Sequence, residues 1–290
     1  MRTSLSALAR RKHGEPLSMV TAYDYTSAQL ADAAGLDLIL VGDSLGMVVL
    51  GYDSTLPVTL EDMIRHGRAV TRGAEHALVV VDLPFTASTD EPTILTSSAR
   101  LLAETGAQSI KLEGGAYRVP AVRTLVQHGI PVMGHLGYTP QSVNTLGTRV
   151  QGRDEAAART LIDDALALQE AGAWAVVLEL VPAELAAEVT RAVDIPTIGI
   201  GAGPDTDGQV QVWHDLLGLY EDFQPRHARR FGTLGDAARE ALAAYRTEVV
   251  ARSFPAEENL SHMDAEVLAR VTGSGPAGEG QGTSGQSTTA

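Results

Sequence analysis

The sequence predicts a parallel (β/α)8 barrel, and three observations lead to this fold class. Short aliphatic runs alternate with longer amphipathic stretches rich in Ala and Leu along most of the chain. The short runs do not alternate between apolar and polar residues, as is typical of parallel strands buried on both faces of a sheet. A doubly wound open sheet is the alternative, but its Gly-rich phosphate-binding turn is absent, because the first strand continues into Tyr23-Asp24-Tyr25.

Each expected strand is a short run dominated by Val, Ile, Leu and Ala. The expected strands cover residues 18–22, 37–41, 77–81, 109–112, 131–134, 175–178 and 197–200, with a weaker one at 209–213. Eight strands in a chain of this size are the number that closes a barrel of this type.

The expected helices lie between these strands and have amphipathic patterns. They cover residues 28–34, 60–72, 93–105, 121–128, 155–171 and 183–193. Several end in Gly, the residue that favours the left-handed position after a helix: Gly35, Gly73, Gly106, Gly129 and Gly172. A further helical stretch at 226–251 is expected to pack outside the barrel or against a partner subunit.

The composition indicates a globular enzyme and excludes several other classes. The chain has 290 residues, of which 44% are hydrophobic, so it can bury a large core. Its formal net charge of -14 argues against general nucleic-acid binding and against docking on anionic lipid. The absence of Cys excludes disulfides, thiolate metal sites and a Cys nucleophile. No secretory leader or membrane span is evident, so we expect a cytoplasmic protein.

We expect one barrel domain over residues 1–262, which includes the later helices, and a C-terminal extension over residues 263–290. From about residue 272 the extension is mainly Gly, Ser, Thr, Gln and Pro. Such a segment cannot bury enough apolar surface to offset the entropy lost on ordering. We therefore expect it to be disordered and to have no catalytic role.

Polar residues gather at the carboxyl ends of the expected strands, where barrel enzymes place their active sites. In strand order they are Asp43 and Ser44, Asp82, Lys111 and Glu113, His135, Glu179, and a Gly-rich run at 199–203. Any one of them alone is more easily explained as a turn, capping or surface residue. Together they predict an active site, because independent turns would not concentrate ionisable groups at one end of the barrel.

Three of these residues are carboxylates on neighbouring strands, namely Asp43, Asp82 and Glu113. Hard divalent cations such as Mg²⁺ prefer such ligands, and three converging carboxylates without a cation would repel one another. We therefore expect a Mg²⁺ site, with other divalent ions possible. Glu113 has an alternative role, since it could pair with a basic residue or reach the metal only through water.

The remaining polar residues suit a small 2-oxo acid. Lys111 can neutralise its carboxylate or a developing enolate oxygen, although a Schiff-base role is the competing interpretation. His135 and Ser44 can hydrogen-bond the substrate. Glu179 lies two strands beyond the metal group and is the candidate general acid/base.

The strand-end motifs together resemble the ketopantoate hydroxymethyltransferase family, also called 3-methyl-2-oxobutanoate hydroxymethyltransferase. They are VGDSLG at 41–46, DSTLPVT at 53–59, DLPF at 82–85, KLEGG at 111–115, GHLGYTPQS at 134–142, LE and VP at 178–182, and GIGAG at 199–203. The resemblance runs from about residue 18 to about residue 262.

The resemblance implies a barrel of the phosphoenolpyruvate mutase and isocitrate lyase group, with extra C-terminal helices. It implies transfer of a hydroxymethyl group from 5,10-methylenetetrahydrofolate to 3-methyl-2-oxobutanoate through a Mg²⁺-stabilised enolate. The product would be 2-dehydropantoate, for pantothenate and coenzyme A synthesis. The family assembles as a homodecamer of two pentameric rings.

Residue by residue, the resemblance assigns Asp43, Asp82 and Glu113 to the metal. It assigns Asp43, Ser44, Asp82, Lys111 and His135 to the substrate side of the site, and Glu179 to the proton acceptor.

The chain departs from the family pattern at residues 86–90, at Thr148 and at residues 226–230. The first two departures concern a lid or the folate contacts, and none removes a proposed catalytic group.

The main alternative function is a carbon–carbon lyase or mutase of the same barrel group, acting on a 2-hydroxy or phospho acid. Those lyases generally rely on a catalytic Cys, which this chain lacks. A non-catalytic, metabolite-binding barrel is the other alternative, and the complete acidic set argues against it.

Overall fold

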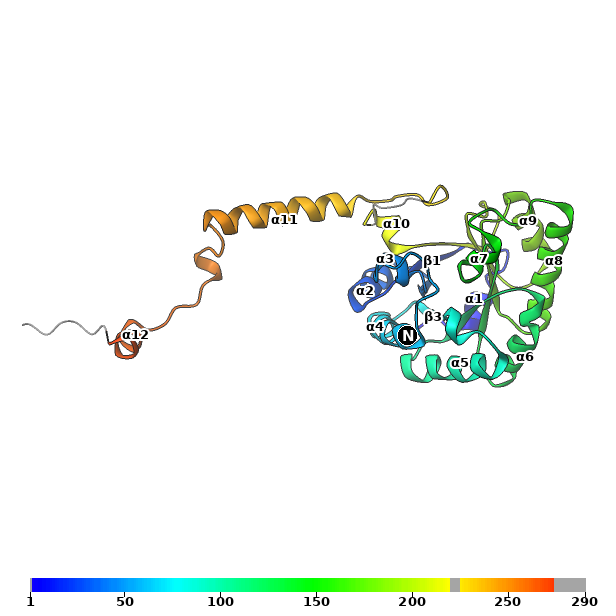
Figure 1. The fold of residues 1–290 in the computed structure, drawn as a ribbon, viewed down its shortest axis with the longest axis horizontal. Helices are drawn as coiled ribbons and strands as arrows, with labels where there is room; N and C mark the ends of the chain where they lie inside the picture. Colours follow the sequence, from blue (N-terminus) through cyan, green and yellow to red (C-terminus); the bar gives the residue numbers. More distant parts are fainter. Residues whose placement is uncertain (1, 220–224, 274–290) are drawn as a thin grey trace, which may run out of the picture. The chain divides into compact units, whose positions relative to one another are not determined.

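The computed structural model describes residues 2–219 and 225–273, and its central element is a closed barrel of eight parallel strands in sequential order (Figure 1). The strands are β1 (Leu17–Thr21), β2 (Leu38–Val41), β3 (Leu78–Asp82), β4 (Ser109–Glu113), β5 (Val132–Gly137), β6 (Ala175–Glu179), β7 (Thr197–Ile200) and β8 (Gly208–Gln211). Pairing of β1 with β8 closes the ring. The predicted fold class is confirmed.

Helices follow the strands and cover the outside of the barrel. The longer ones are α2 (Tyr25–Ala33), α4 (Leu60–Gly73), α5 (Glu91–Thr105), α6 (Val119–Gln127), α8 (Glu155–Glu170) and α9 (Ala183–Ala192). The shorter ones are α1 (Leu5–Ala9), α3 (Leu45–Val48), α7 (Val143–Leu146) and α10 (Trp213–Leu217), with 3₁₀ turns η1 (Phe85–Ala87), η2 (Ala116–Arg118) and η3 (Pro140–Ser142).

Successive residues along each strand belong to two different core clusters. On β3, Val79 and Val81 pack in the cluster that includes the surrounding helices, whereas Leu78 and Val80 pack in the cluster inside the barrel. Both faces are buried, which explains why the sequence shows no apolar–polar alternation. Successive side chains on a strand still point alternately to its two faces, and this decides which residues point into the barrel.

Gly73 has a role different from the helix-ending role predicted for it. It is the last residue of α4 and does not adopt a positive φ, unlike Gly35, Gly106, Gly129 and Gly172. A Cβ at this position would lie 2.4 Å from the carbonyl oxygen of Tyr25. The missing side chain therefore permits α2 and α4 to approach closely.

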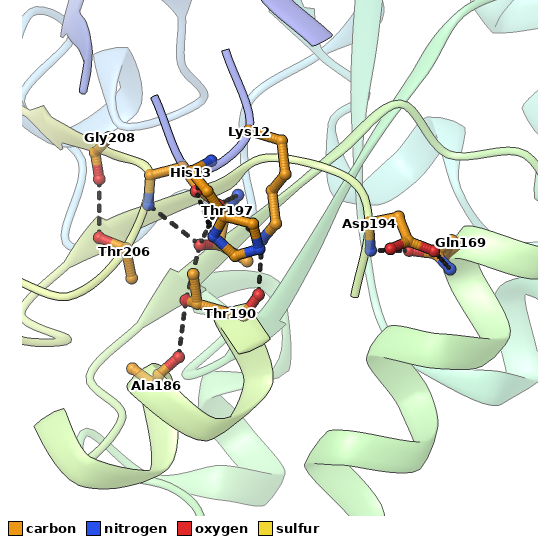
Figure 2. A network of polar contacts seen from close by, with 10 residues as sticks. Lys12, His13, Gln169, Ala186, Thr190, Asp194, Thr197, Thr206 and Gly208 are labelled. Carbon is orange, nitrogen blue, oxygen red and sulfur yellow. Dashed lines mark hydrogen bonds and ion pairs between the residues drawn. The ribbon is translucent and has the colours of Figure 1, made fainter. Parts of the chain in front are cut away.

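The amino-terminal end of the barrel is closed by a buried polar network (Figure 2). Lys12 Nζ donates to the Thr190 carbonyl oxygen at 2.6 Å and to Asp207 Oδ2 at 2.8 Å. Asp207 also accepts from the backbone N–H groups of His13 and Thr197 at 2.8 and 2.9 Å. The network joins the segment before β1 to the starts of β7 and β8, at the end of the barrel that serves stability.

The last strand ends earlier than the sequence predicted. The expected run at 209–213 is β8 at Gly208–Gln211, and Trp213 begins α10 instead. The N–H of Trp213 donates to Thr21 Oγ1 at 2.9 Å, and this contact turns the chain into the helix.

The chain divides into two compact units, residues 1–235 and 236–290. The expected boundary at residue 262 stays a prediction. Helix α11 (Leu234–Ala251) begins later than the expected stretch at 226–251, because residues 226–230 are not helical. Turn η4 (Glu257–Asn259) and helix α12 (Ala265–Thr272) follow. The tail expected to be disordered lies, from residue 274 on, outside the described residues.

Over the two described ranges, no helix combines the length and the apolar character needed to cross a membrane.

Candidate active site

The candidate residues on β3 to β6 all point into the barrel, because they share the inward-facing positions of their strands. On β3, Asp82 continues the inward series of Leu78 and Val80. The register of the sheet places Asp82 beside Lys111, Glu113 beside His135, and Glu179 beside Gly137 on neighbouring strands. Groups far apart in the sequence therefore meet at the carboxyl end of the barrel.

Asp43 and Ser44 reach the same place from the turn after β2. The N–H of Asp43 donates to Asp82 Oδ2 at 3.0 Å, which ties the turn to β3. Ser44 Oγ lies 2.9 Å from the hydroxyl of Tyr23, a buried residue two positions after the end of β1. These contacts tie the turn after β2 to β3 and to the segment after β1.

One cavity of about 740 Å³ joins these groups. Its lining includes every site residue predicted from the sequence: Asp43, Ser44, Asp82, Lys111, Glu113, His135 and Glu179. Apolar residues such as Leu40, Val177 and Val210 form its floor, so the polar groups act in surroundings with little water.

A chain of polar contacts crosses the cavity from Asp82 to Glu179. Lys111 Nζ lies 3.1 Å from Asp82 Oδ1 and 2.9 Å from His135 Nδ1. On the other side of the ring, His135 Nε2 lies 3.3 Å from Glu179 Oε2. An ammonium group can only donate, so Nδ1 of His135 must accept and the ring proton must sit on Nε2, facing Glu179.

The electrostatics of Lys111 and His135 agree with this assignment. Burial and the nearby Lys111 ammonium lower the pKa of His135, so the imidazole is neutral. Burial alone would lower the pKa of Lys111, but the carboxylates of Asp82, Glu113 and Asp43 outweigh it and raise that pKa. Lys111 therefore stays protonated.

The three carboxylates are crowded and buried. Burial raises the pKa of Asp43 well above its usual range, and repulsion from Asp82 and Glu113 raises it further. Burial also raises the pKa of Asp82 and of Glu113, although Lys111 opposes this in both cases. Buried carboxylates that repel one another favour binding of a cation.

The donor set fits a divalent cation held by two carboxylates. Asp82 Oδ1 and Glu113 Oε1 are buried and accept no hydrogen bond that meets the geometric criteria among the described residues, although Lys111 Nζ lies 3.1 Å from the first and His135 Nδ1 lies 3.5 Å from the second. Within the same ranges, no three His, Cys, Asp or Glu side chains are grouped closely enough to hold a metal. Mg²⁺ commonly binds one or two carboxylates and completes its shell with water and substrate oxygens. Asp43 and Asp82 can play this part, and the ligand roles of all three acids stay predictions.

Gln141 is a buried site residue to which the sequence analysis assigned no role. Its Nε2 donates to Asp43 Oδ2 at 2.8 Å and to the Leu83 carbonyl oxygen at 2.9 Å. Its backbone N–H donates to Glu113 Oε2 at 3.0 Å. Gln141 therefore holds two of the acids, and its place in the quoted run at 134–142 was the only sequence signal for it.

Some other residues that line the cavity were not predicted as site residues. Met47, on α3, lines the cavity and was not among the predicted site residues. Pro225, Arg226 and His227 line it too, and the last two lie in the stretch at 226–251 that was expected to be helical. Residues 225–227 lie in a loop, and Met47 lies in the short helix that follows the turn after β2, so the strand and helix patterns did not determine their positions.

Comparison with known proteins gives a consistent picture. A family model described as Ketopantoate hydroxymethyltransferase matches residues 2–257. The 3-methyl-2-oxobutanoate hydroxymethyltransferase of Chloroflexus aurantiacus is 60% identical over 264 residues, which cover 91% of this chain and 94% of the relative. The enzyme of the same name from Gluconacetobacter diazotrophicus is 57% identical over 269 residues, covering 93% and 98%.

Among solved structures, 2,3-dimethylmalate lyase, of the PEP mutase/isocitrate lyase superfamily, matches with a TM-score of 0.54 and 18% identity over 94% of this chain and 95% of that one. Phosphoenolpyruvate phosphomutase from Streptomyces platensis subsp. rosaceus matches with a TM-score of 0.58 and 13% identity, over 94% and 96%. At these identities the likeness concerns the fold alone, and it agrees with the closed eight-stranded barrel.

Proposed function

The chain belongs to the ketopantoate hydroxymethyltransferase family, and we propose that it transfers a hydroxymethyl group from 5,10-methylenetetrahydrofolate to 3-methyl-2-oxobutanoate. The product is 2-dehydropantoate, a precursor of pantothenate and coenzyme A. The observation that carries the proposal is the contact chain from Asp82 through Lys111 and His135 to Glu179. It joins an anion-binding group to a proton acceptor within one cavity.

Lys111 binds and neutralises the anionic oxo acid in this proposal. Its ammonium lies among buried carboxylates, which keep it protonated. A protonated Lys is not a nucleophile, so this environment supports the electrostatic role over a Schiff base. Ser44, held by Tyr23, is placed to donate to the substrate carboxylate.

Glu179 removes the proton from C3 of the oxo acid. Its carboxylate faces Nε2–H of His135, which orients it and leaves the other oxygen available to the substrate. C3 then forms a bond to the methylene carbon of the folate donor, as the first of that carbon's two bonds to nitrogen breaks. Water displaces the second nitrogen and supplies the hydroxyl group. The proton taken from C3 and one proton of the water go to the two nitrogens, and tetrahydrofolate leaves.

Asp43 and Asp82 would hold a divalent cation, Mg²⁺ being our proposal, with Glu113 close by. When bound, the cation would polarise the keto oxygen and stabilise the negative charge that develops there. Gln141 keeps Asp43 and Glu113 in place for this task.

A direct assay tests the proposal. The protein is mixed with 3-methyl-2-oxobutanoate, 5,10-methylenetetrahydrofolate and Mg²⁺, and 2-dehydropantoate is followed by NMR. We expect 2-dehydropantoate to form, its formation to stop when EDTA is added, and its formation to resume with excess Mg²⁺. Absence of product with all three components present would overturn the transferase assignment.

We also propose a homodecamer of two pentameric rings in the cytoplasm, as the family resemblance implies. The protomer mass is 30.5 kDa, so light scattering separates a decamer clearly from smaller assemblies. A measured mass of one or two protomers would contradict this proposal.

A further inference from the structure

The cavity wall formed by β8 and α10 carries two polar groups that the proposed chemistry of the oxo acid does not use. Asp215 lines the cavity and is only 9% exposed, and within the described ranges its carboxylate has neither a hydrogen bond nor an ion pair. Gln211 also lines the cavity, and its Oε1 is buried and has no hydrogen-bond partner among the described residues. Both groups offer acceptor oxygens to whatever occupies this side of the cavity.

An anionic substrate would not pair with the acceptor oxygens on this wall of the cavity. Burial raises the pKa of Asp215 to about 6, and Arg230 opposes this rise, so the carboxylate is mainly ionised at neutral pH. An ionised carboxylate accepts hydrogen bonds and repels another anion. The wall therefore suits a ligand that donates hydrogen bonds or carries positive charge.

The rim of the same cavity has the opposite character. Arg149 and Arg226 both line it, both are exposed, and neither makes an ion pair with a described residue. His227 also lines the cavity. The cavity thus combines an acceptor-rich inner wall with a cationic rim.

The size of the cavity also calls for a second ligand. An oxo acid of five carbons fills only a fraction of about 740 Å³. The folate donor has a pterin ring, whose amino group and adjacent ring N–H form a donor pair spaced for the two oxygens of a carboxylate. Its other end is a glutamate tail with carboxylates, which suit Arg side chains.

We propose that Asp215 and Gln211 bind the reduced pterin ring of the one-carbon donor, with Arg149 and Arg226 facing its glutamate tail. This assignment rests on the proposed function. It fixes the direction in which the donor enters, with the pterin ring against β8 and the tail toward solvent.

The test compares Asp215→Asn with Asp163→Asn, an exposed Asp on α8 outside the cavity lining. Binding of tetrahydrofolate, the folate product, is measured by calorimetry. We expect Asp215→Asn to weaken it by about tenfold or more, because a charge-assisted acceptor is lost. The KM for the oxo acid should change much less than the KM for the folate donor, and Asp163→Asn should match the wild type. Thermal melting confirms that each variant is folded.

A second pair of variants tests the rim. Arg149→Ala combined with Arg226→Ala should weaken binding of tetrahydrofolate that carries several glutamates more than binding of the form with one. Arg159→Ala on the exposed face of α8 is the control. If the double variant loses the same affinity for tetrahydrofolate with one glutamate and with several, Arg149 and Arg226 do not bind the glutamate tail.

The proposed function and this inference can fail separately. If the wild type forms no 2-dehydropantoate, the function fails. If it forms product while folded Asp215→Asn binds tetrahydrofolate as tightly as the wild type, only the pterin site is overturned. A rise in the KM of the oxo acid that matches the rise for the donor would likewise overturn it, since Asp215 would then serve the whole cavity.

Discussion

Lys111 Nζ lies 2.9 Å from Nδ1 of His135, within a site where both side chains are buried. Because an ammonium group cannot accept, this contact determines which ring nitrogen of His135 carries the proton. The proton on Nε2 then faces Glu179. The contact links substrate binding by Lys111 to the orientation of the proposed base.

Replacing His135 should separate these two contacts. Asn places an acceptor near the position of Nδ1, whereas Gln places an amide near the position of Nε2. We therefore expect His135→Asn to lower kcat between about 10- and 100-fold through misplacement of Glu179, with a smaller change in the KM of the oxo acid. His135→Gln should keep more of kcat. Steady-state kinetics decide, and equal kcat for wild type and His135→Asn would contradict the positioning role.

Glu179→Gln should remove the proton acceptor while keeping the size of the side chain. We expect kcat to fall by about 10²- to 10⁴-fold, with oxo acid binding largely retained. Exchange of the C3 proton of the oxo acid in D₂O with Mg²⁺, followed by NMR without folate, should slow to the same degree. An unchanged exchange rate would assign the base to another group.

Asp82→Ala should abolish metal binding and activity together, because Asp82 is one of two proposed ligands. Mn²⁺ binding followed by electron paramagnetic resonance gives a readout independent of turnover. Asp82→Asn keeps the volume of the side chain and guards against a folding defect in the Ala variant. Normal Mn²⁺ affinity in both folded variants would refute the ligand assignment.

Asp207→Asn should destabilise the amino-terminal end of the barrel. Burial acts to raise the pKa of Asp207, but hydrogen bonds from Lys12, Thr197 and His13 outweigh it and hold the pKa below its usual range. A depressed carboxylate pKa contributes stability above its unfolded value, about 4, and this contribution is lost as the pH falls through the folded value.

We therefore expect Asp207→Asn to lower the free energy of unfolding by about 2–4 kcal/mol at pH 7, as for a broken buried pair. The difference in the free energy of unfolding between this variant and the wild type should shrink below about pH 4. Urea unfolding at both pH values measures it, with the exposed neighbour Asp205→Asn as the control. A difference that grows toward acid pH would contradict the sign of the argument.

Gly73→Ala should disturb the contact between α2 and α4. A Cβ at this position meets the backbone of Tyr25, which cannot move aside as a flexible side chain would. We expect a loss of about 1–3 kcal/mol in the free energy of unfolding. Gly232→Ala, where the nearest atom to a Cβ is 3.7 Å away, is the matched control and should change stability little. Urea unfolding of the two variants compares them.

The strand-end residues could be predicted because a barrel brings all carboxyl ends to one mouth, whatever the loops do. Gln141 and Asp215 could not be predicted in the same way. Gln141 meets Asp43 and Glu113 only because the loop after β5 folds back over the mouth. Asp215 lines the cavity because β8 ends at Gln211, two residues before the predicted end at residue 213, and the chain then turns into α10 at Trp213.

The sequence by itself determined the class of the barrel and which strand ends carry acids, because both depend on local patterns of apolar and polar residues. Only the tertiary structure decided which groups touch. The register of β3, β4 and β5 places Lys111 beside Asp82 and sets His135 beside Glu113. Register depends on how all eight strands close into one ring, and no local run of residues encodes that closure.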